Sequence, residues 1–141
     1  MQLRKILKQL VTDNMAVQTY NQKFKEGVSE KLWLNEYCTV KLGTCRQAGH
    51  TTSGVYLGKF YNVLFISPSP HMLSNLKKLT DVGHVTTQWA DDLIGDKIRG
   101  SLYDVVVVDT ISVLTSKQLE DIKNGCATIC KNKEFVLVLL Q

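Results

Sequence analysis

CTVKLGTCRQAGHTT, residues 38–52, is the stretch from which we interpret the rest of the chain. It opens with Cys38–Leu42, a short run of apolar and β-branched residues that predicts a strand. A glycine-containing stretch follows, and Thr51–Phe60 then has the pattern of a helix, with Gly54 and Gly58 on one face for close packing. A strand that turns through glycines into a helix is an arrangement that binds phosphate, because backbone N–H groups and the helix N-terminus point at the anion.

The loop keeps most of the groups that such a site uses and lacks one. A phosphate loop has two glycines five residues apart, then Lys, then Ser or Thr. Here the first glycine is displaced by one residue, to Gly43, while Gly49 and the magnesium-binding hydroxyl of Thr51 are in register, and His50 occupies the position of the Lys. Imidazole is shorter than lysine and mostly neutral at pH 7, because its ordinary pKa is about 6.5. We therefore expect weak binding of a triphosphate, and an ordinary strand–turn–helix connection also fits these residues.

A second stretch, YDVVVVDT at residues 103–110, has the pattern of a strand buried on both faces, because four valines run uninterrupted between aspartates. In parallel sheets, ligands bind at the carboxyl ends of the strands. We therefore expect Asp109, and Ser67 after the apolar strand Asn62–Ile66, at the same edge as the loop. Asp109 and Thr51 would hold Mg²⁺, and Thr110 follows where a hydrolytic enzyme carries Glu.

The other segments alternate between helical and strand patterns. Helices are predicted over Leu3–Val11, Ala16–Lys25, Ser29–Trp33, His71–Leu79 and Ser116–Cys130, the last with Ser116 as its N-cap, and Asp91–Ile98 is predicted as a helix or a turn. Strands are predicted over Val85–Trp89 and Phe135–Leu140. This alternation predicts an α/β fold, a three-layer α/β/α arrangement with a mostly parallel sheet preceded by N-terminal helices. A chain of 141 residues, 44% hydrophobic and 21% charged, is about one domain, with a helical region over 1–36 and a core over 37–141.

The N-terminal quarter has two further features. Leu3, Ile6, Leu7, Leu10 and Val11 recur at three- and four-residue steps, and predict one apolar stripe. Basic residues concentrate in the same quarter, at Arg4, Lys5, Lys8, Lys23, Lys25 and Lys31. With a net charge of +4 and a pI of about 8.9, they are compatible with a DNA-facing surface. A solvated helix face explains them equally well.

The four cysteines do not form a disulfide pattern, and no apolar run approaches the roughly 20 residues that span a membrane. Cys126 and Cys130 share a helix face, as paired metal ligands do, but no His or Cys partner stands at a suitable spacing, so we expect buried thiols. Cys45, beside Arg46 in the loop, is either a thiol with a lowered pKa or an incidental one. With no signal peptide visible, we expect a cytoplasmic protein without a membrane partner.

The amino-acid sequence of the loop also resembles that of a known protein family. Residues 45–52, CRQAGHTT, resemble the Arg-Gln-x-Gly-Lys-Thr-Thr loop of the large terminase subunits of tailed bacteriophages, which use ATP to pump DNA into capsids. Tyr37–Leu42 fits the strand before that loop. Ile98-Arg99-Gly100, followed by the strand ending in Asp109, is similar to the terminase pattern of Arg-Gly before the acidic strand, and Phe135–Gln141 falls where the family has its coupling strand.

The resemblance implies the additional-strand class of P-loop NTPases, which terminases share with helicases. It implies ATP and Mg²⁺ as ligands, with Mg²⁺ held by Thr51 and Asp109. It also implies that Arg46 contacts or senses phosphate. The nucleotide-binding residues would be Gly43, Arg46, Gln47, Gly49, His50, Thr51, Thr52 and Asp109.

Two departures from the family pattern fall on catalytic groups. His50 replaces the Lys, and Thr110 replaces the Glu that activates water, so we expect ATP hydrolysis to be weak or absent and neither ATP nor Mg²⁺ to be obligatory. The favoured hypothesis is a degenerate P-loop protein of phage origin that acts in the host cytoplasm by binding DNA or a phage or host protein. The alternatives are an active ATPase coupled to DNA, and an interaction module or host-enzyme inhibitor that kept only the scaffold. A homo-oligomer is compatible with each.

Overall fold

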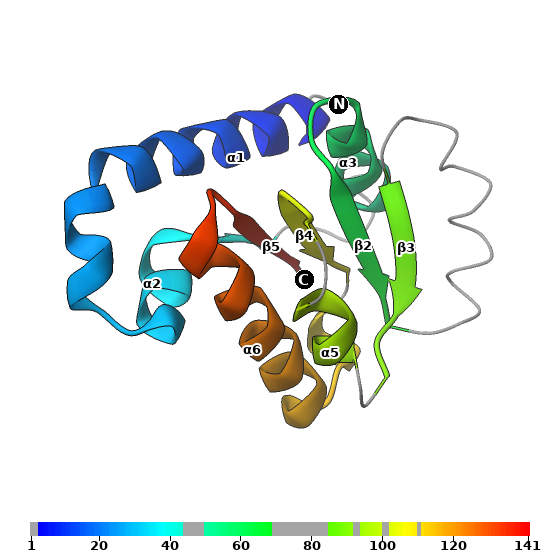
Figure 1. Ribbon diagram of the computed structural model, residues 1–141. Helices are drawn as coiled ribbons and strands as arrows, with labels where there is room; N and C mark the ends of the chain where they lie inside the picture. The colour runs from blue at the N-terminus through cyan, green and yellow to red at the C-terminus, as the bar shows by residue number, and fades with distance from the viewer. Residues whose placement is uncertain (1–2, 44–49, 69–84, 92–93, 100–101, 110) are drawn as a thin grey trace.

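The computed structural model describes residues 3–43, 50–68, 85–91, 94–99, 102–109 and 111–141, without the side chains of 50–52 and 89 (Figure 1). The strands are β1 (Thr39–Leu42), β2 (Val63–Ser67), β3 (Val85–Trp89), β4 (Val105–Val108) and β5 (Val136–Leu140). The α-helices are α1 (Leu3–Tyr20), α2 (Glu30–Tyr37), α3 (His50–Tyr56), α5 (Ile94–Arg99) and α6 (Ser116–Asn132). Short 3₁₀ helices are η1 (Gln22–Gly27), η3 (Leu57–Lys59) and η4 (Ile111–Val113).

The five described strands form one sheet in the order β1-β5-β4-β2-β3, and every pair in it is parallel. The predicted mostly parallel sheet is therefore confirmed. The last strand in the chain, β5, lies between β1 and β4, with Val40 opposite Val138 on one side and Val107 opposite Val138 on the other. All strands end at the same edge because they run in the same direction.

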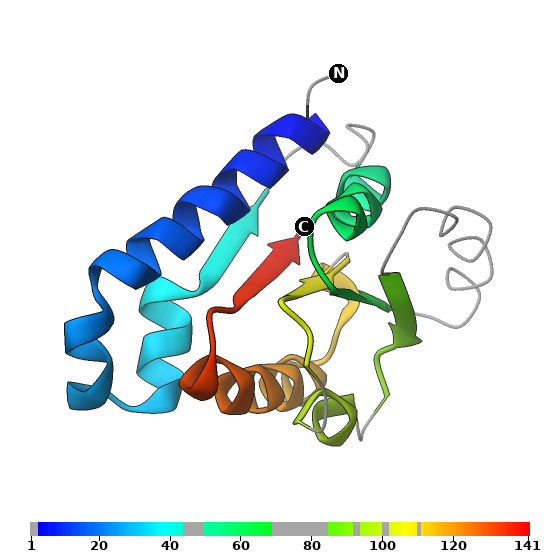
Figure 2. The same ribbon diagram turned by 45° about the horizontal axis from the view of Figure 1, so that its top comes forward.

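Helices cover both faces of the sheet, which makes the fold a three-layer α/β/α arrangement (Figure 2). The strands of β4 and β5 are completely buried, as expected for a parallel sheet covered on both sides. One core cluster joins α1 and α3 to the odd-numbered valines of β4, and the other joins α2, α5 and α6 to the even-numbered ones. The uninterrupted valine run of β4 therefore contributes side chains to both hydrophobic clusters.

The N-terminal prediction is wrong in two respects. The chain forms one continuous helix, α1, where we predicted two, and the segment before Gly27 is the 3₁₀ helix η1. The single apolar stripe also divides, because Leu3, Leu7 and Val11 are buried whereas Ile6 and Leu10 remain exposed. Successive helical residues are about 100° apart, so a helix lying on a flat sheet buries only part of such a wide apolar arc.

The helix starts show which side chains act as caps. Ser29, predicted as the first residue of a helix, caps α2, since its hydroxyl accepts a hydrogen bond from the Leu32 N–H at 3.1 Å. For α6 the predicted cap was Ser116, but the structure has Thr115. The Thr115 hydroxyl accepts from the Gln118 N–H at 3.1 Å and the Gln118 side chain accepts from the Thr115 N–H at 3.0 Å, which together make a capping box.

Candidate functional site at the ends of the parallel strands

The carboxyl ends of the strands are joined by short backbone hydrogen bonds. Gln141, after β5, donates its N–H to the Leu42 carbonyl of β1 at 3.1 Å. Asp109, after β4, donates its N–H to the Ile66 carbonyl of β2 at 3.0 Å. The expectation that Gly43, Ser67 and Asp109 belong to one edge of the sheet is therefore met for these three residues.

Buried polar residues mark this edge. Among the described residues, four polar or charged side chains are buried, and they are Gln18, Ser53, Ser67 and Asp109. Ser67 ends β2, Asp109 follows β4 and Ser53 belongs to the first turn of α3. A carboxyl that is only 4% exposed is unusual, because burying a charge is costly unless polar groups or a cation compensate.

Gly54 determines how closely α3 approaches the sheet. A Cβ atom at this position would lie 2.7 Å from the Phe65 ring of β2 and 3.0 Å from the Val107 side chain of β4. The predicted close packing at Gly54 is confirmed. Because α3 lies this near the sheet, its first turn is held next to the strand that ends in Asp109.

Gly43 has a close neighbour that we did not identify as a site residue. A Cβ at Gly43 would lie 2.8 Å from the Gln141 side-chain oxygen, so the glycine at the exit of β1 leaves room for the amide at the exit of β5. Gln141 was predicted only as the end of a strand. Nothing in the chain between the two residues signals their contact, since it arises from the pairing of β1 with β5.

Part of the predicted site lies outside the described residues. These are Cys45, Arg46, Gln47, Gly49 and Thr110, and the predicted helix His71–Leu79 lies outside them too. For His50, Thr51 and Thr52 the backbone belongs to α3 and the side chains are not described. The phosphate and Mg²⁺ contacts predicted for these residues remain predictions.

The cysteines of the described residues belong to the core. Cys38, Cys126 and Cys130 are buried free thiols, as predicted for the last two. Burial raises the pKa of Cys126. A hydrogen bond between the thiols of Cys38 and Cys130 lowers the pKa of Cys130 and raises that of Cys38. Within the described ranges, no group of three or more His, Cys, Asp or Glu side chains is placed to hold a metal ion.

A groove lies away from this edge of the sheet. Its volume is about 1020 Å³, and it is lined by residues of η1, the start of α2, Arg99 and the C-terminal half of α6. The helix α6 begins after β4 ends and finishes just before β5 begins, so its C-terminal half lies at the opposite edge of the sheet from Asp109. The groove is therefore separate from the candidate site, which we place at the strand ends because its residues carry the relevant chemistry.

The fold and the described part of the site define an α/β protein with a parallel five-stranded sheet, a helix directly after the loop that follows its first strand, and a buried aspartate two strands away. Comparison with protein family models finds no match, and comparison with curated proteins finds none either. Within the part of the chain that is described, every helix is too short or too polar to cross a bilayer.

Proposed function

We propose that this chain is a degenerate P-loop NTPase-like protein of phage origin. In this proposal the strand-end site binds nucleotide weakly and hydrolyses it slowly or not at all. The protein then acts in the cytoplasm of a bacterial host by binding DNA or a protein partner. The observation that carries the proposal is the position of β5 between β1 and β4.

This strand order supports the additional-strand class. The name of the class refers to a further strand beside the strand of the phosphate loop. The resemblance places the coupling strand of the terminase family at Phe135–Gln141, which includes β5. Since β5 pairs with β1 on one side and β4 on the other, the loop strand and the acidic strand lie two positions apart in the sheet. The carboxyl ends of β1 and β4 are then about two strand spacings of roughly 4.8 Å apart, and in this proposal a hydrated Mg²⁺ and a phosphate group bind between them.

The two substitutions give the proposal its degenerate character. Phosphoryl transfer depends on positioned positive charge and on a group that orients the attacking water. His50 supplies less charge at pH 7 than Lys does, and Thr110 is a poor general base. The retained groups, Gly49, Thr51 and Asp109, are those that shape the loop and hold Mg²⁺.

Titration calorimetry with Mg-ATP, combined with a phosphate-release assay, tests the proposal. We expect weak or undetectable binding and no steady turnover. Turnover at ordinary ATPase rates, of the order of 1–100 s⁻¹, would contradict the degenerate interpretation. If that turnover also disappeared in Asp109→Ala and Thr51→Ala, the chain would be an active ATPase that uses the same site.

A reversion experiment tests whether the strand-end loop is a phosphate loop at all. We expect His50→Lys to bind Mg-ATP at least about tenfold more tightly than the wild type, because it restores a permanent cation next to the phosphates. Asn132→Lys is the matched control, since it adds the same charge at an exposed position at the end of α6. Equal gains in both variants would show a nonspecific charge effect, and no gain from His50→Lys would exclude a phosphate loop here.

A further inference from the structure

One side of α1 carries a row of exposed apolar side chains. Ile6, Leu10, Val17 and Tyr20 are 47%, 37%, 46% and 83% exposed. With about 100° between successive helical residues, these four and Asp13 fall within an arc of about 80°. We call these five residues the α1 stripe. It adjoins the buried side of the helix, which holds Leu3, Leu7, Val11 and Gln18.

The spacing of the α1 stripe is that of a helix-packing seam. Its members follow one another at steps of four, three, four and three residues, from Ile6 to Tyr20. This alternation places side chains along one face of a helix, and a second helix can pack against that face. Isolated exposed apolar residues need no explanation, but a continuous row at this spacing on one helix indicates a surface for another helix.

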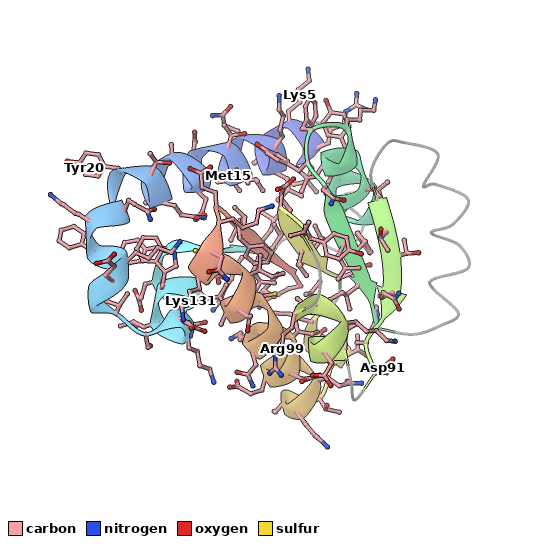
Figure 3. All side chains as sticks on the ribbon, viewed as in Figure 1. Lys5, Met15, Tyr20, Asp91, Arg99 and Lys131 are labelled. Carbon is pink, nitrogen blue, oxygen red and sulfur yellow. The ribbon has the colours of Figure 1, made fainter. Side chains whose placement is uncertain are left out.

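Asp13 is the one charged member of the stripe. The nearby cations Arg4 and Lys8 are on the opposite side of α1, where they lie over the rings of Tyr56 and Phe60. Figure 3 shows Lys5 near the start of α1 and Tyr20 at its end, both on the outside of the molecule. A helical partner is therefore favoured when it brings a cation to Asp13.

Asp13 distinguishes between three candidate partners of the stripe, which are a membrane surface, a second copy of the chain and a helix of another protein. It lies at the centre of the α1 stripe, where the exposed side chain of Gln9 donates a hydrogen bond to its carboxylate at 2.8 Å. On a membrane surface this carboxylate would face lipid, which is unfavourable. A second copy of the chain would bring like charges together in either direction. A parallel pair would place Asp13 against Asp13, and an antiparallel pair would place Lys5 near the partner's Lys23.

We propose that the α1 stripe binds an amphipathic helix of another protein. This helix carries apolar residues at the same four–three spacing and one cationic residue opposite Asp13. The inference does not depend on nucleotide binding, because the stripe residues are separate from the strand-end site. Four partly exposed side chains cover much less than the roughly 800 Å² per partner of a stable interface, so the complex is a reversible one.

The test uses a fluorescein-labelled peptide of eighteen residues with leucines at the four–three spacing and one central arginine. Fluorescence anisotropy measures its binding to the full chain. Val17→Ser and Tyr20→Ser should each weaken binding by about tenfold, since each removes an apolar anchor. Val113→Ser and Leu102→Ser are the matched controls, because these apolar residues are 62% and 79% exposed away from α1, and both should bind like the wild type. Far-UV circular dichroism checks that each variant is folded.

A charge exchange tests the register. Asp13→Arg should weaken binding of the arginine peptide, and replacing the central arginine of the peptide by glutamate should restore it. Peptide binding should be the same in Asp109→Ala, which separates this inference from the nucleotide site. Equal effects of the stripe and control variants would overturn the proposal. Sedimentation of a wild-type dimer that dissociates in Val17→Ser would assign the stripe to a second copy. Binding to phosphatidylglycerol vesicles that is lost in Val17→Ser would assign it to lipid.

Discussion

Gln18 connects the N-terminal helix to the sheet. Its side-chain amide donates to the Phe135 carbonyl at 2.7 Å and its oxygen accepts from the Phe135 N–H at 3.3 Å, so it pairs with the backbone at the entrance to β5 as a neighbouring strand would. The side chain is 2% exposed. A glutamine in a helix whose other buried residues are apolar gives no sequence signal for this role, because its partner is more than 100 residues away.

Replacing Gln18 by leucine should lower the free energy of unfolding by about 1–3 kcal/mol, because it leaves two buried backbone groups of Phe135 without partners. Urea denaturation measures this change. Gln9→Leu is the control, since the Gln9–Asp13 hydrogen bond is exposed, and it should change stability by no more than about 0.5 kcal/mol. Equal effects of the two substitutions would mean that the Gln18–Phe135 pairing is not stabilising.

Gly54 gives a second prediction at the residue scale. Gly54→Ala should destabilise the protein by about 1–3 kcal/mol, because the added methyl would overlap the Phe65 ring and press on Val107. Gly27→Ala is the comparison, since a Cβ there has nothing within 4 Å, and it should be neutral or stabilising by up to about 1 kcal/mol. Thermal denaturation of both variants checks the pair, and a neutral Gly54→Ala would show that α3 can move away from the sheet.

At the scale of elements, α6 shows how a helix start is chosen between two suitable residues. Thr115 and Ser116 both have hydroxyl side chains that favour an N-cap, and we predicted Ser116. The structure selects Thr115 because Gln118 then stands at the third helical position and completes the capping box. Gln118 also donates to the Ala90 carbonyl at 2.8 Å, which ties the start of α6 to the segment after β3.

Thr115→Ala should lower stability by about 1 kcal/mol, since the Gln118 N–H loses its acceptor at the start of α6. Ser116→Ala should change stability by less than about 0.5 kcal/mol, because the Ser116 hydroxyl is not the cap. Urea midpoints for the two variants measure the difference. The reverse order of effects would support the sequence-based assignment of Ser116 as the cap.

At the scale of the whole molecule, the N-terminal helix belongs to the body of the protein. Leu7 and Val11 of α1 share a buried cluster with residues of α3 and of three strands, among them Val138 and Phe65. Trp33 of α2 belongs to the cluster on the other face. Each face of the sheet therefore includes a helix from the region 1–36, and removing that region would expose apolar surface on both.

We expect urea unfolding to be one cooperative transition for this reason. The loss of helix measured by far-UV circular dichroism and the change in tryptophan fluorescence should have the same midpoint, as in small two-state proteins. An earlier loss of part of the helical signal would indicate that α1 unfolds separately from the sheet. The Val17→Ser variant is a suitable control, because it alters only the exposed side of the same helix.

Much of the fold was predictable because burial leaves local patterns. The valine run of β4, the apolar runs of β2 and β5 and the alternation of helices with strands predicted a parallel α/β sheet that the structure confirms. Asp109 and Ser67 were predicted at the strand ends, and they lie there. The buried residues of α1, such as Leu7 and Val11, could not be distinguished in advance from the exposed residues Ile6 and Leu10. The sequence contains both sets, and only packing against the sheet decides which set is buried.

The sequence by itself determined the succession of elements, the direction of the strands and the chemistry of the loop, because all of these depend on residues close together in the chain. Only the tertiary structure decided that β5 enters between β1 and β4, that Gln141 meets Gly43, that Gln18 pairs with Phe135 and that the α1 stripe faces outward. These features arise from contacts between residues far apart in the chain. A local pattern records that a side chain is buried, whereas packing alone determines what it is buried against.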